Sequence, residues 1–522
     1  MGVVVATTHG KIEGVQAEGH QFFRGIPYAA PPVGDARFAA PRPPEPWAGI
    51  RDCSEFGPSA PQPPSPLPGM ESGPQGEDCL SLNVYTPAAA GATPAAAGAT
   101  PAAAGATPAT AAASRPVMVW IHGGGFTGGS GSQALYEGAS LTCRGQIVLV
   151  TVNYRLGILG YLHLADHADR LEGATSNVGQ RDQIAALEWV RDNIEAFGGD
   201  PNRVTIFGES AGGMAVSTLL AMPGARGLFH GAIAQSGATH ATHSRDSATR
   251  VVDAVLGELE ISSEKIERLR EISTDEILRA QLRVSAQLAG DVFLSYAPTI
   301  DADTLPQAPL DLIRAGESQD IPLMVGANQD EWKLFSVMNP KHFELDDASL
   351  TKAVASRLRN LEGADPQRII EIYRACRPQA PAWDILDAIE TDRVFRVPAI
   401  RLAEARSAHQ ASTYKYSFNW KSPARRGKLG SCHALELPFV FNTFDAPTMD
   451  RFAGTGPEAD ALCQAMMDSW VAFARGGDPN CDALPAWSPY GEEKRSTMIL
   501  DRTRELRDAP ADRERAAWDG LL

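Results

Sequence analysis

The segment from Ile206 to Gly213, IFGESAGG, constrains the fold of this chain more than any other. It contains a Gly-x-Ser-x-Gly pattern centred on Ser210, directly after the apolar, β-branched run at residues 204–207. This pattern predicts a buried strand that ends at the serine and a helix from Ala211 to Met222. Glycines on both sides suit a sharp strand-to-helix turn, which leaves no room for Cβ atoms. Such a turn exposes the serine hydroxyl at the edge of a sheet, where a base can activate it as a nucleophile.

Other segments alternate between strand-like and helix-like patterns, which favours parallel βαβ units. Residues 179–197 carry apolar side chains at helical spacing, and Gly198 and Gly199 favour the end of that helix. Asp200-Pro201 then predicts a turn into the strand that reaches the serine. Further strands are predicted at residues 80–85, 116–121, 147–152, 231–234, 322–326 and 414–418. We expect an α/β fold of one domain over residues 1–522, with a doubly wound, mostly parallel central sheet flanked by helices.

The composition is that of an ordinary globular protein with a large core, since 43% of the 522 residues are hydrophobic and 21% are charged. The formal net charge of −16 argues against nucleic acid and against an anionic membrane surface as partners. The first residues show neither the basic segment nor the apolar run of a signal peptide, and no membrane span is expected. Seven scattered cysteines without Cys-x-x-Cys spacing favour reduced thiols and a cytoplasmic location.

A low-complexity segment lies at residues 87–114, where the heptad PAAAGAT occurs three times in tandem between residues 87 and 107. Proline and glycine interrupt every heptad, and such a composition cannot bury a face against a core. We therefore expect a long surface loop that joins the strands at 80–85 and 116–121, without a function of its own.

A second glycine-rich segment, WIHGGGF at residues 120–126, follows the apolar strand at 116–121. Consecutive glycines allow backbone N–H groups to approach a negatively charged oxygen without interference from side chains. We predict that Gly124, Gly125 and Ala211 donate their N–H groups to the oxyanion of a tetrahedral intermediate. A plain flexible turn is the alternative interpretation of the three glycines.

A serine nucleophile also needs a histidine as base and an acid to orient it. In hydrolases with this serine motif, the acid and then the histidine follow the serine along the chain. His433 fits best as the base, because it follows a strand-like run and a loop, whereas His409 lies in a helical stretch. Glu331 and its neighbour Asp330 both follow the strand at 322–326, and spacing alone does not choose between them.

The ordered set of motifs resembles that of the type-B carboxylesterases, the esterase and cholinesterase group of the α/β-hydrolase fold, especially bacterial members of the para-nitrobenzyl esterase type. The matching stretches run almost from end to end, and include FFRGIPYAAPPVGDARF, EDCLSLNVYTP, WIHGGGF, NYRLGILGY, GANQDEW and CHALELPFVF. The resemblance implies that Ser210 is the nucleophile, Glu331 rather than Asp330 the acid, and His433 the base. It implies the same three oxyanion donors, Gly124, Gly125 and Ala211.

The resemblance also implies supporting roles. Glu209 and Ser236 lie behind the triad in relatives and are expected to tune His433 through hydrogen bonds. Two pairs are expected to be buried ion pairs of the scaffold, Arg37 with Glu77 and Arg155 with Asp182. The substrate pocket is expected near Phe126, Trp332 and Phe395.

By this resemblance the chain is expected to be a serine carboxylesterase, which cleaves small-molecule esters to acid and alcohol through an acyl-enzyme, with no cofactor and no metal. A lipase, an amide or carbamate hydrolase with the same triad, and a non-catalytic cholinesterase-like binding protein are the alternatives. The loop at 61–78 contains no aromatic residue that could hold a quaternary ammonium, so choline esters are not expected as substrates. A monomer or a small homo-oligomer is expected.

Overall fold

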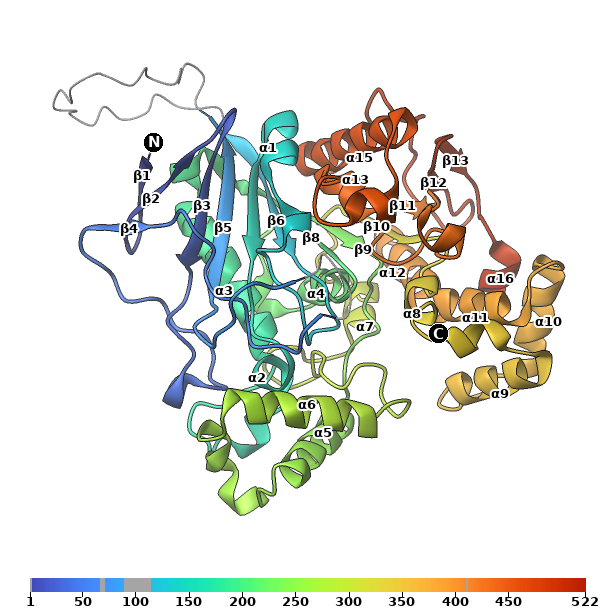
Figure 1. Cartoon of the computed structure of the whole chain (residues 1–522), viewed down its shortest axis with the longest axis horizontal. Coiled ribbons are helices and arrows are strands. Elements are labelled where there is room, and N and C mark those ends of the chain that lie inside the picture. Colours follow the sequence, from blue (N-terminus) through green and yellow to red (C-terminus); the bar gives the residue numbers. More distant parts are fainter. Residues whose placement is uncertain (1, 66–70, 89–113, 410–411) are drawn as a thin grey trace.

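A computed structural model of the chain describes residues 2–65, 71–88, 114–409 and 412–522 (Figure 1). The described strands form one sheet in the order β1-β2-β3-β5-β7-β6-β8-β9-β10-β11-β12-β13, with β4 paired to β2. Their bounds are β1 (Gly2–Thr7), β2 (Gly10–Gln16), β3 (His20–Pro27), β4 (Ile50–Asp52), β5 (Ser81–Pro87), β6 (Arg115–Ile121), β7 (Val148–Val152), β8 (Gly199–Glu209), β9 (Gly231–Gln235), β10 (Leu323–Asn328), β11 (Thr413–Phe418), β12 (Thr497–Leu500) and β13 (Glu505–Arg507).

The centre of the sheet is parallel, from β7 through β6, β8, β9, β10 and β11 to β12. Antiparallel pairs occur only towards the two edges of the described sheet, among β1, β2, β3, β5 and β7 and between β12 and β13. The central strands are buried on both faces, as in β7, whose residues VLVTV are all buried. The predicted mostly parallel sheet is thereby confirmed.

Helices cover both faces of the sheet, and strand β6 contributes apolar side chains to the core on each face. Val117, Val119 and Ile121 belong to the apolar cluster that contains α3 and α4, whereas Met118 and Trp120 belong to the cluster that contains α13 and α15. Alternate side chains of a strand point to opposite faces, so a continuous apolar run can fill two layers of core. The helices of these layers are α1 (Ala139–Gly145), α2 (Gly157–Tyr161), α3 (Val178–Asn193), α4 (Ala211–Leu219), α12 (Val397–Ser407), α13 (Leu437–Phe441) and α15 (Pro457–Gly476).

The structure describes further helices, which are α5 (Arg245–Glu258), α6 (Thr274–Gln287), α7 (Pro309–Arg314), α8 (Lys333–Ser336), α9 (Asp347–Leu358), α10 (Pro366–Cys376), α11 (Ala382–Thr391), α14 (Met449–Ala453) and α16 (Asp512–Ala516). Of these, α5, α6, α9 and α10 lie at the periphery of the molecule (Figure 1). Helices α9, α10 and α11 share a small apolar core with the buried side chain of Trp518. Among the helices that the structure describes, none combines the length and the apolar character that crossing a membrane requires.

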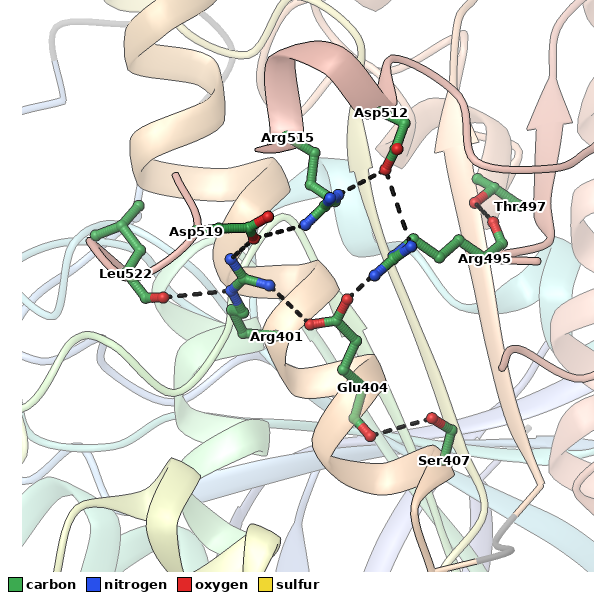
Figure 2. A network of polar contacts seen from close by, with 9 residues as sticks. All are labelled: Arg401, Glu404, Ser407, Arg495, Thr497, Asp512, Arg515, Asp519 and Leu522. Atoms are coloured by element: carbon green, nitrogen blue, oxygen red, sulfur yellow. Dashed lines mark hydrogen bonds and ion pairs between the residues drawn. The ribbon is translucent and has the colours of Figure 1, made fainter. Parts of the chain in front are cut away.

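The end of the chain is held against α12 by a network of ion pairs (Figure 2). Arg401 donates to the carbonyl oxygen of Leu522 at 3.2 Å and pairs with Asp519 at 2.7 Å and with Glu404 at 2.9 Å. Glu404 also contacts Arg495 at 3.2 Å, in the segment before β12. Three separate parts of the sequence are thus joined at one helix.

The predicted elements agree with the observed ones within a few residues, except at the start of β8. Asp200-Pro201 was expected to form a turn before the strand, but β8 already begins at Gly199. Arg115 of β6 pairs with Gly199, and the next pair joins Val117 to Val204. The proline therefore lies in an irregular stretch of the strand. The repeat lies outside the described residues from 89 to 113, and the strands on either side of it are β5 and β6.

The two expected scaffold ion pairs are confirmed. Arg37 Nε donates to Glu77 at 2.8 Å, and Arg155 Nη2 lies 2.6 Å from Asp182 Oδ1. The side chains of Arg155 and Asp182 are 4% and 0% exposed, and Asp182 also accepts a hydrogen bond from the backbone N–H of Arg155.

Replacing Asp182 by asparagine is expected to lower the free energy of unfolding by about 3–5 kcal/mol, because it leaves the Arg155 charge buried without a counter-charge. Urea denaturation followed by circular dichroism measures this change. The matched control is Asp468→Asn, which breaks the exposed pair with Arg144 and should cost no more than about 1 kcal/mol. Equal losses in the two variants would contradict the scaffold role of the buried pair.

Candidate active site

Ser210 occupies a strained turn between β8, which ends at Glu209, and α4, which begins at Ala211. Its backbone has φ +57° and ψ −124°, a conformation that residues other than glycine rarely adopt. A Cβ atom at Gly212 would clash with the carbonyl oxygen of Ile121. The turn therefore needs its glycine, and it leaves the serine partly exposed.

The structure brings His433 and Glu331 together beyond the carboxyl ends of neighbouring strands. Glu331 follows β10, and His433 follows the loop after β11. The Nδ1 atom of His433 lies 2.6 Å from Oε2 of the fully buried Glu331. The other oxygen of Glu331 accepts a 2.6 Å hydrogen bond from the backbone N–H of Asn328. The carboxylate is thus fixed, and it can orient the imidazole.

The two competing residues have other contacts. Asp330 pairs with Lys333 at 2.9 Å and accepts a hydrogen bond from the backbone N–H of Ser431 at 3.0 Å. It therefore holds the loop that precedes His433. His409 donates from Nε2 to the carbonyl oxygen of Arg314 at 2.8 Å, in an exposed position.

Glu209, the residue before Ser210, reaches the other side of the imidazole. Its Oε1 atom lies 3.1 Å from Nε2 of His433 but outside hydrogen-bond direction, so the contact is an electrostatic one. His433 is thereby placed between the acid that follows β10 and the residue next to the serine.

The charges around His433 favour its protonated form. Burial lowers the pKa of His433, but the carboxylates of Glu209 and Glu331 outweigh burial and raise this pKa above its ordinary value. Burial also raises the pKa of Glu209, and the nearby His433 opposes that rise. The imidazole is therefore a stronger base than a histidine in water.

The glycine loop after β6 lies against the serine. A Cβ atom at Gly123 would be 3.1 Å from Cβ of Ser210, and Gly124 and Gly125 have φ +110° and +63°. In the described parts of the chain, the backbone N–H groups of Gly124, Gly125 and Ala211 have no hydrogen-bond acceptor. Three unpaired donors beside a serine can stabilise an oxyanion.

Gly124 is a predicted oxyanion donor, and replacing it by alanine is expected to lower kcat by about 100- to 1,000-fold, the usual loss when one such donor is removed. Its φ disfavours a side chain, and a Cβ atom there would clash with the carbonyl oxygen of Gly128, so the donor must move. Hydrolysis of p-nitrophenyl acetate measures the effect. The control is Gly34→Ala, which has φ +58° but open space around the new Cβ, and an equal loss there would contradict the local explanation.

The sequence did not single out Glu436, which is buried with 0% exposure. It accepts hydrogen bonds from the side-chain amides of Asn328 at 2.6 Å and Gln235 at 3.2 Å. Burial and the nearby Glu331 raise the pKa of Glu436. The available signal was a lone glutamate inside the apolar run that follows His433. Ser236, expected to contribute hydrogen bonds, has a buried hydroxyl without a partner among the described residues.

Aromatic rings lie around the imidazole. Phe395 and Phe335 have ring centroids 4.7 Å and 5.2 Å from that of His433, and Trp332 packs 5.0 Å from Phe335. Phe335 is 43% exposed and was not named among the expected pocket residues. Phe126, which was named, is fully buried and packs against other core residues.

The carboxylesterase family profile matches residues 2–518. The para-nitrobenzyl esterase of Bacillus subtilis is 37% identical over 518 residues, which cover 98% of this chain and 97% of that protein. The phenmedipham hydrolase of Pseudarthrobacter oxydans is 33% identical, with 95% of this chain and 94% of that protein covered.

Solved structures agree with these matches. A carboxylesterase of Geobacillus stearothermophilus is 37% identical and matches with a TM-score of 0.86 over 99% of both chains. A thermophilic para-nitrobenzyl esterase is 36% identical and has a TM-score of 0.83 over 98% of this chain and 99% of that one. The expected α/β-hydrolase fold is confirmed by these neighbours, and the chain belongs to the carboxylesterase family.

Proposed function

We propose that this carboxylesterase cleaves its substrates in two steps through an acyl-enzyme on Ser210. His433 Nε2 accepts the hydroxyl proton while Ser210 Oγ attacks the ester carbonyl carbon. The amides of Gly124, Gly125 and Ala211 stabilise the oxyanion that forms. The protonated imidazole then gives its proton to the leaving alkoxide, and the alcohol departs. Water, activated by the same base, attacks the acyl-enzyme and releases the carboxylic acid and the free serine.

One observation carries this proposal. His433 contacts Glu331 through Nδ1 at 2.6 Å. Its other ring nitrogen, Nε2, lies 3.1 Å from Glu209, the residue before Ser210. A base held by a buried carboxylate through one ring nitrogen, with the other nitrogen 3.1 Å from the residue before a partly exposed serine, supports acyl transfer. The aromatic rings of Phe335 and Phe395 support aryl esters as substrates, in keeping with the name of the para-nitrobenzyl esterase relative.

Stoichiometric labelling by an organophosphate tests the nucleophile directly. We expect one phosphoryl group per chain, located on Ser210 by peptide mass spectrometry, together with complete loss of p-nitrophenyl acetate hydrolysis. Labelling of another residue with the same loss of activity would refute the assignment. A binding protein without catalysis would show neither labelling nor hydrolysis.

The pH dependence should change when Glu209 is replaced by glutamine. His433 acts as a base only when neutral, so kcat/KM falls as the pH decreases through the pKa of His433. The Glu209 charge raises that pKa, so its removal should move the acid limb to lower pH. Profiles of kcat/KM for p-nitrophenyl acetate measure the shift.

The matched control for this profile is Glu436→Gln. Its carboxylate is also buried, but its hydrogen bonds go to Asn328 and Gln235 rather than to the imidazole. We expect a smaller shift in this variant. An unchanged acid limb in Glu209→Gln would show that Glu209 does not set the pKa of the base.

A further inference from the structure

A large apolar groove lies beside the candidate active site. Its volume is about 770 Å³, within the range of about 300–1,000 Å³ that is usual for small-molecule sites. Its walls come from α8 and the residues that follow it, from the loop after β11, and from α14. Most of the lining is apolar, including Leu334, Met338, Leu429, Ala434 and Phe452.

Two residues that line the groove are chain neighbours of residues at the reaction centre. Ala434 follows the base His433, and Leu334 precedes Phe335, whose ring lies 5.2 Å from the imidazole. In the proposed mechanism the imidazole gives its proton to the leaving alkoxide, so the alcohol part of the ester must lie on the side of His433. The groove borders the segments that carry His433 and Phe335.

Two cationic side chains in the lining give the groove a preference for an anionic group. Arg425 and Arg451 both line it, and none of its described lining residues is acidic. Neither guanidinium has an ion-pair or hydrogen-bond partner among the residues that the structure describes. Arginines in this acidic chain commonly find carboxylates, as Arg401 does with Glu404 and Asp519. An apolar channel with two unpaired arginines complements an apolar chain that ends in a carboxylate.

We propose that the groove binds the alcohol part of the substrate, and that it selects an apolar chain with a terminal carboxylate. The apolar walls contact the chain, and Arg425 and Arg451 bind the anionic end. This inference rests on the proposed function, since it assigns a substrate class to the same site.

The test compares two esters in wild-type enzyme, the butyrates of ω-hydroxyoctanoate and of ω-hydroxyoctanamide, which differ only in the charge of the terminal group. We expect kcat/KM to be about tenfold higher for the carboxylate at low ionic strength, mainly through a lower KM. The ratio should fall as salt is added, because salt screens exposed charges. Equal values for the two esters in wild-type enzyme would overturn the proposal.

Variants separate direct contact from the general attraction of a basic loop. In the double variant Arg425→Gln/Arg451→Gln the ratio should fall towards one. Arg426→Gln is the matched control, because Arg426 is exposed in the same loop but does not line the groove, and it should retain the wild-type ratio. An equal fall in the control would overturn the assignment of the two groove arginines.

Hydrolysis of p-nitrophenyl acetate tests the proposed function separately from the groove assignment. A wild-type enzyme that cleaves this ester but does not distinguish the two butyrates contradicts only the groove assignment. A Ser210→Ala enzyme that still cleaves it contradicts the proposed function.

Discussion

Replacing Ser210 by alanine is expected to lower kcat/KM for p-nitrophenyl butyrate by about 1,000-fold or more, the usual result of removing a catalytic nucleophile. Ser210 is partly exposed in a strained turn, next to the unpaired amides of Gly124 and Gly125 in the glycine loop and of Ala211 in α4. In the proposed mechanism Ser210 alone forms the acyl-enzyme, so the remaining rate should come from binding and from the oxyanion donors. Steady-state kinetics of the purified variant measure the loss.

The controls for this variant are a second serine and the base. Ser217 lies on the same helix, α4, and its hydroxyl donates to the carbonyl oxygen of Gly213 at 2.9 Å. Ser217→Ala should keep most of the activity. His433→Ala should lose about as much as Ser210→Ala, and the double variant little more, because residues that act as a unit are not additive. Near wild-type activity in either single variant would refute the triad.

The parts of the fold that could be predicted are those that a short stretch of sequence determines. Strand β7 is a continuous apolar run because both of its faces are covered, and a pattern of this kind is visible in the sequence. The pattern that marks the turn at Ser210 is equally local, because Gly208 and Gly212 lie within two residues of the serine. The irregular start of β8 was missed, since proline and aspartate also favour turns.

The parts that could not be predicted depend on loops that meet only in space. Glu436 becomes part of the site because Asn328, at the end of β10, donates to it across 108 residues of sequence. Phe335 lies in α8, four residues after Glu331, and its ring centroid is 5.2 Å from that of His433. Spacing along the chain contains no information about such contacts, and a resemblance to a family supplies roles only for residues whose motifs it matches.

The choice between Glu331 and Asp330 shows this limit most clearly, since spacing left two adjacent carboxylates open, the family resemblance favoured Glu331, and the side-chain contacts now distinguish the two. Glu331 touches the imidazole at 2.6 Å, whereas Asp330 pairs with Lys333. We expect Glu331→Gln to lower kcat for p-nitrophenyl butyrate by about 1,000-fold, because an amide can present N–H to Nδ1 and favour the wrong tautomer. The amide also lacks the charge that stabilises the imidazolium formed during catalysis.

The matched variant is Asp330→Asn, which makes the same change of carboxylate to amide one residue away. Lys333 keeps a second partner, Asp384, at 3.0 Å, and the amide oxygen of asparagine can still accept from the backbone N–H of Ser431. We therefore expect a loss of less than about tenfold, since a single partly exposed ion pair contributes little. Measured side by side, the two kcat values decide the assignment: a large loss in Asp330→Asn with a small one in Glu331→Gln would transfer the acid role to Asp330.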